Sequence, residues 1–240
     1  MTHKRRSKGK KGVSVSFIPE MKLTVTKDVL LSNPSNKQRF IEVVGQRLSA
    51  RSCKVLHDQS DADVLIAKTA IESAASMDTI LVGDDIDLLI LLIHHAPLDK
   101  YDIFFTSERK KNSKNRIWNI KEVKTGLGTF VCKHMLFLHA VLGCDTTSRL
   151  FGIGKGSILK KFKEKAKLQK AALIFDNPHS TQAQIDQAGE SALVLIYNGK
   201  KGDSLNGLWY KKYCEKVAMS LSQVDPKSLP PSAAAASFHS

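Results

Sequence analysis

The sequence predicts an α/β protein with an open, mostly parallel sheet flanked by helices and a helical extension that contains a helix-turn-helix. Short apolar strands alternate with helical patterns up to about residue 125, and the patterns after it are helical only. Hydrophobic residues make up 42% of the 240 residues, which is enough to bury a core. The longest apolar runs fall far short of the roughly 18 residues that a membrane helix needs, so no membrane partner is expected.

The first elements are a helix, a strand, a second helix and a second strand. Apolar side chains recur at helical spacing over residues 35–50, and a short strand is predicted over 53–56. Ser60 followed by Asp63 is typical of a capping box, so a helix is predicted to begin there. A strand over 80–82 follows.

The next elements complete the predicted sheet. Asp85 is expected to cap a helix over residues 86–94. Strands are predicted over 103–105 and 117–120, separated by a polar, basic stretch over 108–116 that is typical of a solvated loop.

The helical extension is predicted from apolar and basic helical patterns. These are an apolar helix over 130–142, a glycine-rich turn over 152–156, a basic helix over 157–170, and helices near 183–197 and 205–219. The predicted organisation is a basic arm over 1–34, an α/β core over 35–125, the helical extension over 126–222 and a flexible tail over 223–240.

Charge is distributed unevenly along this chain of net charge +14. Residues 1–57 carry 13 basic and 3 acidic side chains, residues 58–102 carry 2 and 10, and residues 103–170 carry 16 and 4. The basic flanks favour a polyanion, most commonly nucleic acid. The acidic segment would repel a phosphate backbone unless a divalent cation bridges the two, and a solvated acidic face is the alternative.

Carboxylates gather in three groups, each at or near a predicted helix start. The groups are Asp61 and Asp63, then Asp84, Asp85 and Asp87, then Asp145. Helix capping alone explains single carboxylates at such positions. It does not require a second carboxylate two residues further on, which occurs in both of the first two groups. Two explanations for these carboxylates therefore remain: helix capping, and a pocket that binds hard, oxygen-seeking cations.

The segment GIGKG is a candidate phosphate contact. Gly152, Gly154 and Lys155 lie between two helical patterns, where backbone N–H groups can face a phosphate at a helix N-terminus. A simple turn between helices explains the glycines equally well. The lysines that follow, which include Lys160 and Lys161, could lie along a phosphate backbone.

Histidine and cysteine give no catalytic pattern. His134 and His139 are expected to be core or surface residues, because neither has a partner at the spacing of a catalytic dyad. The four cysteines form no CxxC pair, which favours a reducing compartment over a disulfide framework.

Taken in order, three segments resemble the PIN-like, flap-endonuclease-type nuclease superfamily. They are DADVLI at 61–66, VGDDIDLL at 82–89 and GCDTTSRLFGIGKG at 143–156. In that superfamily an acidic pair opens a helix, a second pair follows a strand, and a GxD segment leads into a glycine-rich helix-turn-helix. A weaker likeness to transposon-associated members runs over most of the chain.

The resemblance implies a PIN-like core and a metal-dependent nuclease that cuts DNA, or RNA, at junctions or ends. The resemblance also implies that one or two Mg²⁺ or Mn²⁺ ions would be held by Asp61, Asp63, Asp85, Asp87 and Asp145. Asp84 would not bind the metal directly and would at most contact one of these ligands. Gly152, Gly154 and Lys155 would grip the nucleic-acid backbone. DNA is the favoured partner, and the nucleus is favoured over the cytoplasm.

The chain also departs from the superfamily. Two further strands, each with a metal-binding Asp, should precede the first acidic pair, but the acidic residues of 1–57 are only Glu20, Asp28 and Glu42. Two interpretations remain open. The chain is a fragment that starts inside the arch region of a nuclease, or it is an inactive relative that retains nucleic-acid binding.

Overall fold

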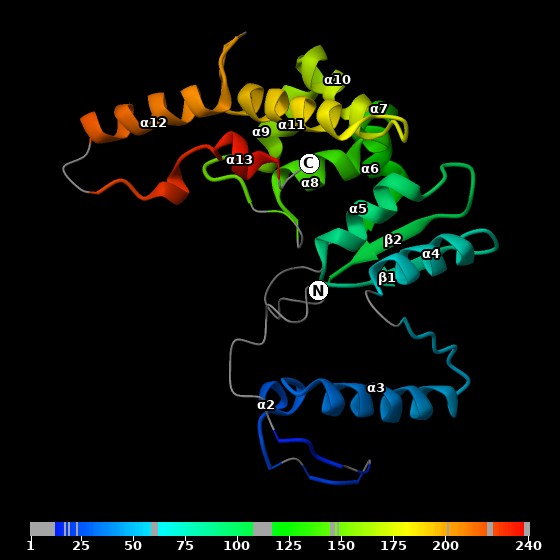
Figure 1. The fold of residues 1–240 in the computed structure, drawn as a ribbon. Helices are drawn as coiled ribbons and strands as arrows, with labels where there is room; N and C mark the ends of the chain where they lie inside the picture. The colour runs from blue at the N-terminus through cyan, green and yellow to red at the C-terminus, as the bar shows by residue number, and fades with distance from the viewer. Residues whose placement is uncertain are drawn as a thin grey trace. The chain divides into compact units, whose positions relative to one another are not determined.

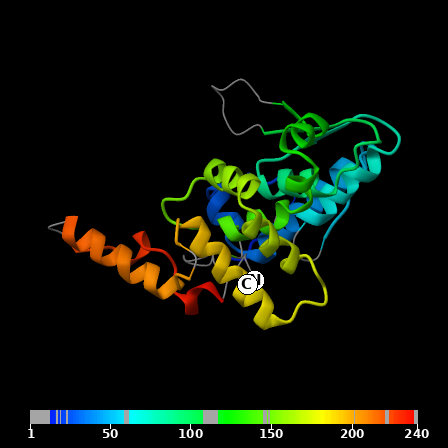
Figure 2. The ribbon, with the colours of Figure 1, turned by 90° about the horizontal axis from the view of Figure 1, so that it is seen from above.

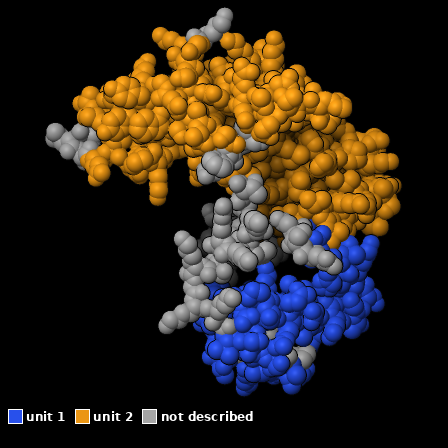
Figure 3. Space-filling view, in the orientation of Figure 1, with its two compact units in different colours: residues 1–62 blue, residues 63–240 orange. Residues whose placement is uncertain are grey.

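The computed structural model describes residues 13–16, 18, 20–22, 24–58, 62–107, 117–144, 147, 149–200, 202–219 and 223–237. The chain forms two compact units, residues 1–62 and residues 63–240, and each is described by itself (Figure 3).

Unit 1 is built on the helix that the apolar spacing predicts. Helix α3 (Pro34–Ser49) follows the short helix α2 (Lys27–Leu31). Asn33 caps α3, because its side chain accepts a hydrogen bond from the backbone N–H of Ser35, and Pro34 occupies the first turn, where no N–H is needed. The predicted helix over 35–50 is thus confirmed.

One buried amide, that of Asn36, organises the remainder of unit 1. Only 1% of this residue is exposed. Its Oδ1 accepts from the Val15 N–H at 2.7 Å, and its Nδ2 donates to the carbonyls of Val13 at 2.9 Å and Leu30 at 3.1 Å. A buried amide needs such partners, and here they fasten the segment before α2 to α3.

The strand predicted over 53–56 is wrong. Residues 53–58 have no regular structure, and Leu56 is exposed. The three strands of the described chain all belong to unit 2, and the described part of unit 1 contains no strand with which this segment could form a ladder.

Unit 2 contains a small mixed sheet in the order β1-β2-β3. Strand β1 (Thr79–Val82) runs parallel to β2 (Ile103–Thr106), whereas β3 (Ile117–Asn119) runs antiparallel to β2. The α/β class is therefore confirmed, but the expectation of a mostly parallel sheet holds for one of the two pairings. The link over 108–116, which lies outside the described residues, is shorter than the dozen or so residues of a parallel crossover.

Helices α4 (Asp63–Ser73) and α5 (Ile86–His95) cover this sheet, as Figure 1 shows. Both match the predicted helices, although Ser60 of the expected capping box lies outside the described residues. Ala67 and Ala70 of α4 are buried against the sheet core, where their small side chains permit close packing with β1.

Helix α5 contributes to two hydrophobic cores. Leu88 and Leu92 belong to the core of the sheet, and Ile93 belongs to a larger core formed by the helical part of the chain. Leu89 packs against both. A helix with apolar residues on every side needs burial on more than one side, and α5 contributes side chains to both cores, although Ile86 in its first turn is exposed.

The helical part contains more breaks than the sequence predicts. The expected helix over 130–142 is interrupted at His134, and the expected helix over 157–170 begins two residues early and is interrupted at Lys165. The helices α11 (Gln182–Ile196) and α12 (Leu205–Met219) follow the predicted patterns. The others are α6 (Ile120–Leu127), α7 (Thr129–Lys133), α8 (Met135–Leu142), α9 (Lys155–Glu164) and α10 (Ala166–Phe175).

The break after α9 is compensated by a side chain, whereas the break at His134 is not. At the end of α9, Gln169 donates from Nε2 to the carbonyls of Phe162 at 2.9 Å and Lys163 at 3.3 Å, so these groups keep a partner where the helix stops. His134 is fully buried, and its Nδ1 lies 2.5 Å from a carboxylate oxygen of Asp176 without the alignment of a hydrogen bond. Periodicity alone does not reveal such changes of direction.

The described part of the predicted flexible tail, residues 223–237, contains regular structure. A short 3₁₀ turn (Pro226–Ser228) and helix α13 (Ala233–Ala236) follow α12. Leu229 and Ala236 are buried, and α13 packs against α11. Figure 2 shows α12 extending away from the other helices of unit 2. No described helix has the length and apolar composition needed to cross a bilayer.

The helical core depends on Phe162, which is fully buried and lies near the rings of Phe130 and Phe137. We expect Phe162→Ala to lower the free energy of unfolding by about 3–5 kcal/mol, because it removes a buried ring and leaves a cavity. Leu173→Ala on α10, whose side chain is 48% exposed, is the matched control and should change it far less. Denaturant unfolding followed by circular dichroism measures both.

Candidate functional site

The carboxyl ends of β1 and β2 meet at one edge of the sheet because the two strands are parallel. There the Gly83 N–H donates to the carbonyl of Thr106 at 2.9 Å, and Ser107 Oγ donates to Asp84 Oδ1 at 2.5 Å. Asp84 therefore joins the ends of the two strands. In α/β sheets this edge is where ligands bind.

Gly83 makes the turn from β1 into α5 short. A Cβ atom at this position would lie 2.7 Å from Leu88 Cδ1 and 3.3 Å from Leu81 Cδ2. The tight turn places Asp84 and Asp85 directly between the end of the strand and the first turn of the helix.

Asp85 caps α5 as the sequence predicts. Its Oδ1 accepts from the N–H of Asp87 at 3.1 Å, and its backbone is extended, as a cap requires. Helix capping thus explains the carboxylate of Asp85. It does not explain the carboxylate of Asp87 in the first turn.

Asp87 is held by His139 of α8. The distance from His139 Nε2 to Asp87 Oδ1 is 2.8 Å, and the two side chains are only 11% and 25% exposed. No spacing pattern in the sequence predicts this pair, because the residues are 52 positions apart and only the packing of α8 on α5 brings them together. The position of His139 on the helix just before the GCD segment was the one available signal.

The segment after α8 is fastened to this helix. Thr147 Oγ1 donates to the Ala140 carbonyl at 2.7 Å and accepts from the Cys144 N–H at 3.0 Å. The described residues on either side of position 145 are therefore tied to the last turn of the helix that carries His139.

Of the other three predicted ligands, the structure describes only Asp63. Asp63 is half-buried at the start of α4, which leads back into β1 and so begins at the same edge of the sheet (Figure 1). Asp61 and Asp145 lie outside the described residues, as do the basic residues of 4–11. Within the described part of the chain, no three His, Cys, Asp or Glu side chains are grouped closely enough to hold a metal ion.

The GIGKG segment presents its backbone to open space. Gly152 has φ +71°, a conformation that favours glycine, and Gly154 is the N-cap of α9. Added Cβ atoms at Gly152, Gly154 and Gly156 would meet nothing within 4 Å among the described residues. The first N–H groups of α9, which begins at Lys155, need partners that the helix cannot supply.

Lys160 and Lys161 have different environments although they are adjacent. Lys160 is exposed, whereas Lys161 Nζ donates to the Ile196 carbonyl and, at 2.8 Å, to Asn198 Oδ1. Burial, and secondarily the charge of Lys165, lowers the pKa of the Lys161 ammonium. Lys161 therefore caps the C-terminus of α11, and the predicted phosphate contact is better assigned to Lys160.

Comparison of the chain with protein-family models, with curated proteins and with solved structures finds no match. The geometry of the site therefore carries the functional argument by itself.

The cap on α11 gives a testable difference between the two lysines. We expect Lys161→Gln to lower the free energy of unfolding by about 1 kcal/mol, because two acceptors at a helix end lose their donor. Lys160→Gln, on the same helix and exposed, should stay within about 0.5 kcal/mol of the parent chain. Thermal and denaturant unfolding measure both variants. If Lys161→Gln and Lys160→Gln lose the same free energy of unfolding, the assigned cap is contradicted.

Proposed function

We propose that this chain is a metal-dependent nuclease that hydrolyses phosphodiester bonds, with Asp85 and Asp87 at the centre of its site. The observation that carries the proposal is the convergence at the edge of the β1–β2 pair. Ser107 after β2 contacts Asp84, and His139 on α8 contacts Asp87. Three segments that are distant in sequence thus meet at one set of carboxylates, which separate helix caps do not require.

The donor chemistry at this edge fits a hard divalent cation, because carboxylate oxygens are the ligands that Mg²⁺ and Mn²⁺ prefer. Asp85 and Asp87 would supply ligands from the described chain, and Asp61, Asp63 and Asp145 would complete the set; Asp63 would have to move toward the pair, because the structure does not group it with them. The bound ion would activate water and stabilise charge on the scissile phosphate. His139 holds the carboxylate of Asp87 in position, and the cap on α5 does the same for Asp85.

Nucleic acid is the proposed substrate because the charge and the open backbone favour a phosphate polymer. The 16 basic side chains of residues 103–170 outnumber the 4 acidic ones, and this segment includes the GIGKG turn and α9. The exposed backbone at Gly152 and Gly154 can approach a phosphate closely, since no side chain intervenes. DNA is the favoured form of the substrate, and RNA is the alternative.

A second candidate is nucleic-acid binding without catalysis. It is favoured by the structural use of both central carboxylates, since Asp85 caps α5 and Asp87 is paired with His139. In this case the acidic edge is structural, and binding depends on the basic segments alone.

The substitution Asp85→Asn separates the two candidates. Asn caps helices as well as Asp does, so the fold is expected to persist while the charge is lost. For a nuclease, we expect Mg²⁺- or Mn²⁺-dependent cleavage of labelled 5′-flap DNA to fall at least about 100-fold, because metal-held charge contributes several kcal/mol to the transition state.

Asp99→Asn is the matched control for charge. Asp99 is exposed near Asp78 and Asp102, at the edge where β1 and β2 begin, away from the proposed site. Its replacement should leave cleavage unchanged. Binding without cleavage by the parent chain, at any Mg²⁺ or Mn²⁺ concentration, would leave only the binding candidate.

The role of the glycine-rich turn is tested by Gly156→Ala. The substitution places a methyl group between the first turn of α9 and a bound phosphate, so we expect DNA affinity at low salt to fall about two- to tenfold, the value of one hydrogen bond. Stability should not fall, because Ala favours a helix and the space is open. Gly126→Ala, equally open on α6, should leave affinity unchanged in the same fluorescence-anisotropy titration.

A further inference from the structure

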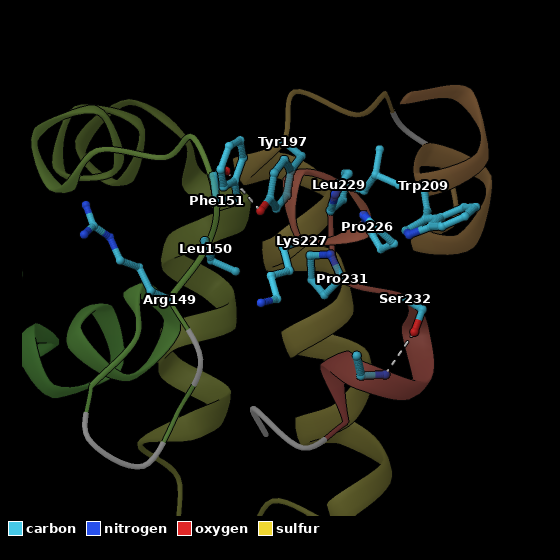
Figure 4. A pocket seen from close by; sticks show the side chains of 12 residues that line it. Arg149, Leu150, Phe151, Tyr197, Trp209, Pro226, Lys227, Leu229, Pro231 and Ser232 are labelled. Carbon is cyan, nitrogen blue, oxygen red and sulfur yellow. Dashed lines mark hydrogen bonds between the residues drawn. The ribbon is translucent and has the colours of Figure 1, made fainter. Parts of the chain in front are cut away.

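A hollow in the helical part of unit 2 is lined by aromatic and basic side chains that the proposed catalytic site does not use. Its volume is about 260 Å³, and its walls come from the segment after α8, from the end of α11, from α12 and from the folded tail. Figure 4 shows Phe151 and Tyr197 on one side and Trp209 on the other, with Pro226 and Leu229 between them.

The aromatic rings are held in place and remain at least partly exposed. Phe151 is 55% exposed although its neighbour Leu150 is buried in the core. The Tyr197 hydroxyl donates to the Phe151 carbonyl at 3.5 Å, and burial raises the pKa of Tyr197, so the phenol stays neutral. Trp209 is stacked on Tyr213 with 5.5 Å between ring centroids and 7° between planes, which fixes the orientation of the indole.

The charge of the hollow is positive. Arg149 and Lys227 line it and are exposed, and Lys216 Nζ lies 5.6 Å from the centroid of the Phe151 ring. None of the described residues that form its walls is acidic. Such a surface complements an anion that also carries an aromatic group.

The hollow continues toward the glycine-rich turn. A second, adjoining hollow of about 440 Å³ shares Arg149, Phe151 and Lys227 with it and extends to Gly152 and Gly154. A ligand that follows both hollows would pass from the aromatic rings to the open backbone before α9.

A proline-rich peptide fits this surface less well. Aromatic grooves do bind such peptides. Here, however, Pro226, Pro230 and Pro231 of the chain itself already form part of the wall. A peptide of that kind also gives no role to Arg149 and Lys227. A nucleotide uses both features, because its base stacks on rings and its phosphate binds cations.

We infer that this hollow binds an unpaired nucleotide of a nucleic-acid strand, with the base stacked at Phe151 and Tyr197 and the phosphates at Arg149 and Lys227. The inference rests on the proposed function, because it takes nucleic acid as the ligand. It adds that the bound strand has unpaired bases. Such a strand would lie next to the turn proposed to hold the backbone.

Trp209 provides the readout. In a Trp118→Phe background it is the one tryptophan of the chain, so its fluorescence reports on this hollow. In EDTA, where no metal-dependent cleavage occurs, the protein is titrated with an oligodeoxythymidine of about 12 nucleotides, within the site size of single-strand binders, and with a blunt duplex of the same length. We expect quenching by the single strand.

Phe151→Leu keeps an apolar side chain and removes the stacking face. We expect it to weaken single-strand binding about tenfold, in line with the value of one stacked base, and to leave blunt-duplex binding unchanged. Tyr101→Leu, an exposed aromatic at the far edge of the sheet, should change neither. Arg149 and Lys227 are exposed, so Arg149→Gln and Lys227→Gln should fold. Each should reduce the slope of log affinity against log salt by about 0.7. These two variants test the hollow independently if Phe151→Leu fails to fold.

Two results would overturn the inference. One is single-strand affinity and salt dependence that all three variants leave unchanged, and the other is Trp209 quenching by a proline-rich peptide but not by the oligonucleotide. Cleavage that depends on Asp85 but not on Phe151 removes this inference and keeps the nuclease. Phe151-dependent binding without any cleavage removes the nuclease and keeps this inference.

Discussion

The burial of α5 on two sides is the constraint on which the rest of unit 2 depends. One side of the helix lies against the sheet through Leu88 and Leu92, and Ile93 lies in the helical core. Because most of the side chains of this helix are apolar, packing against both cores stabilises it. Its first turn carries the candidate carboxylates, and near its last turn His94 Nδ1 lies 3.3 Å from the Cys132 carbonyl on α7. The packing that stabilises the fold therefore also sets the position of the site.

The candidate site combines structural and chemical demands on the same carboxylates. Asp84 joins two strand ends, Asp85 caps a helix, and Asp87 pairs with His139. Each contact uses one oxygen of a carboxylate that has two, and a carboxylate can accept several hydrogen bonds. For Asp85 and Asp87, a structural partner is thus compatible with a ligand on the same carboxylate. These structural contacts also explain the acidic edge without any ligand. A substitution that removes a carboxylate charge and preserves the fold is therefore needed to decide the function.

Local rules predicted the elements that local chemistry determines. The Asp85 cap, the strand over 80–82 and the helices α11 and α12 follow from side chains within a few positions of each other. The strand over 53–56 was wrong, and the mostly parallel sheet holds for only one of its two pairings, because both features depend on distant partners. For the site, spacing indicated Asp84, Asp85 and Asp87 at a strand end, while His139 and the capping role of Lys161 depend on contacts between helices that no local pattern records.

The amide of Asn36 has a consequence for the chemical durability of unit 1. This side chain acts as both acceptor and donor, since it binds the Val15 N–H and two carbonyls, those of Val13 and Leu30. Deamidation would exchange one nitrogen for oxygen. The acceptor would remain, but both donors would be lost and a negative charge would face two carbonyl oxygens inside the protein. Deamidation of this one side chain would thus be enough to release the segment before α2 from α3.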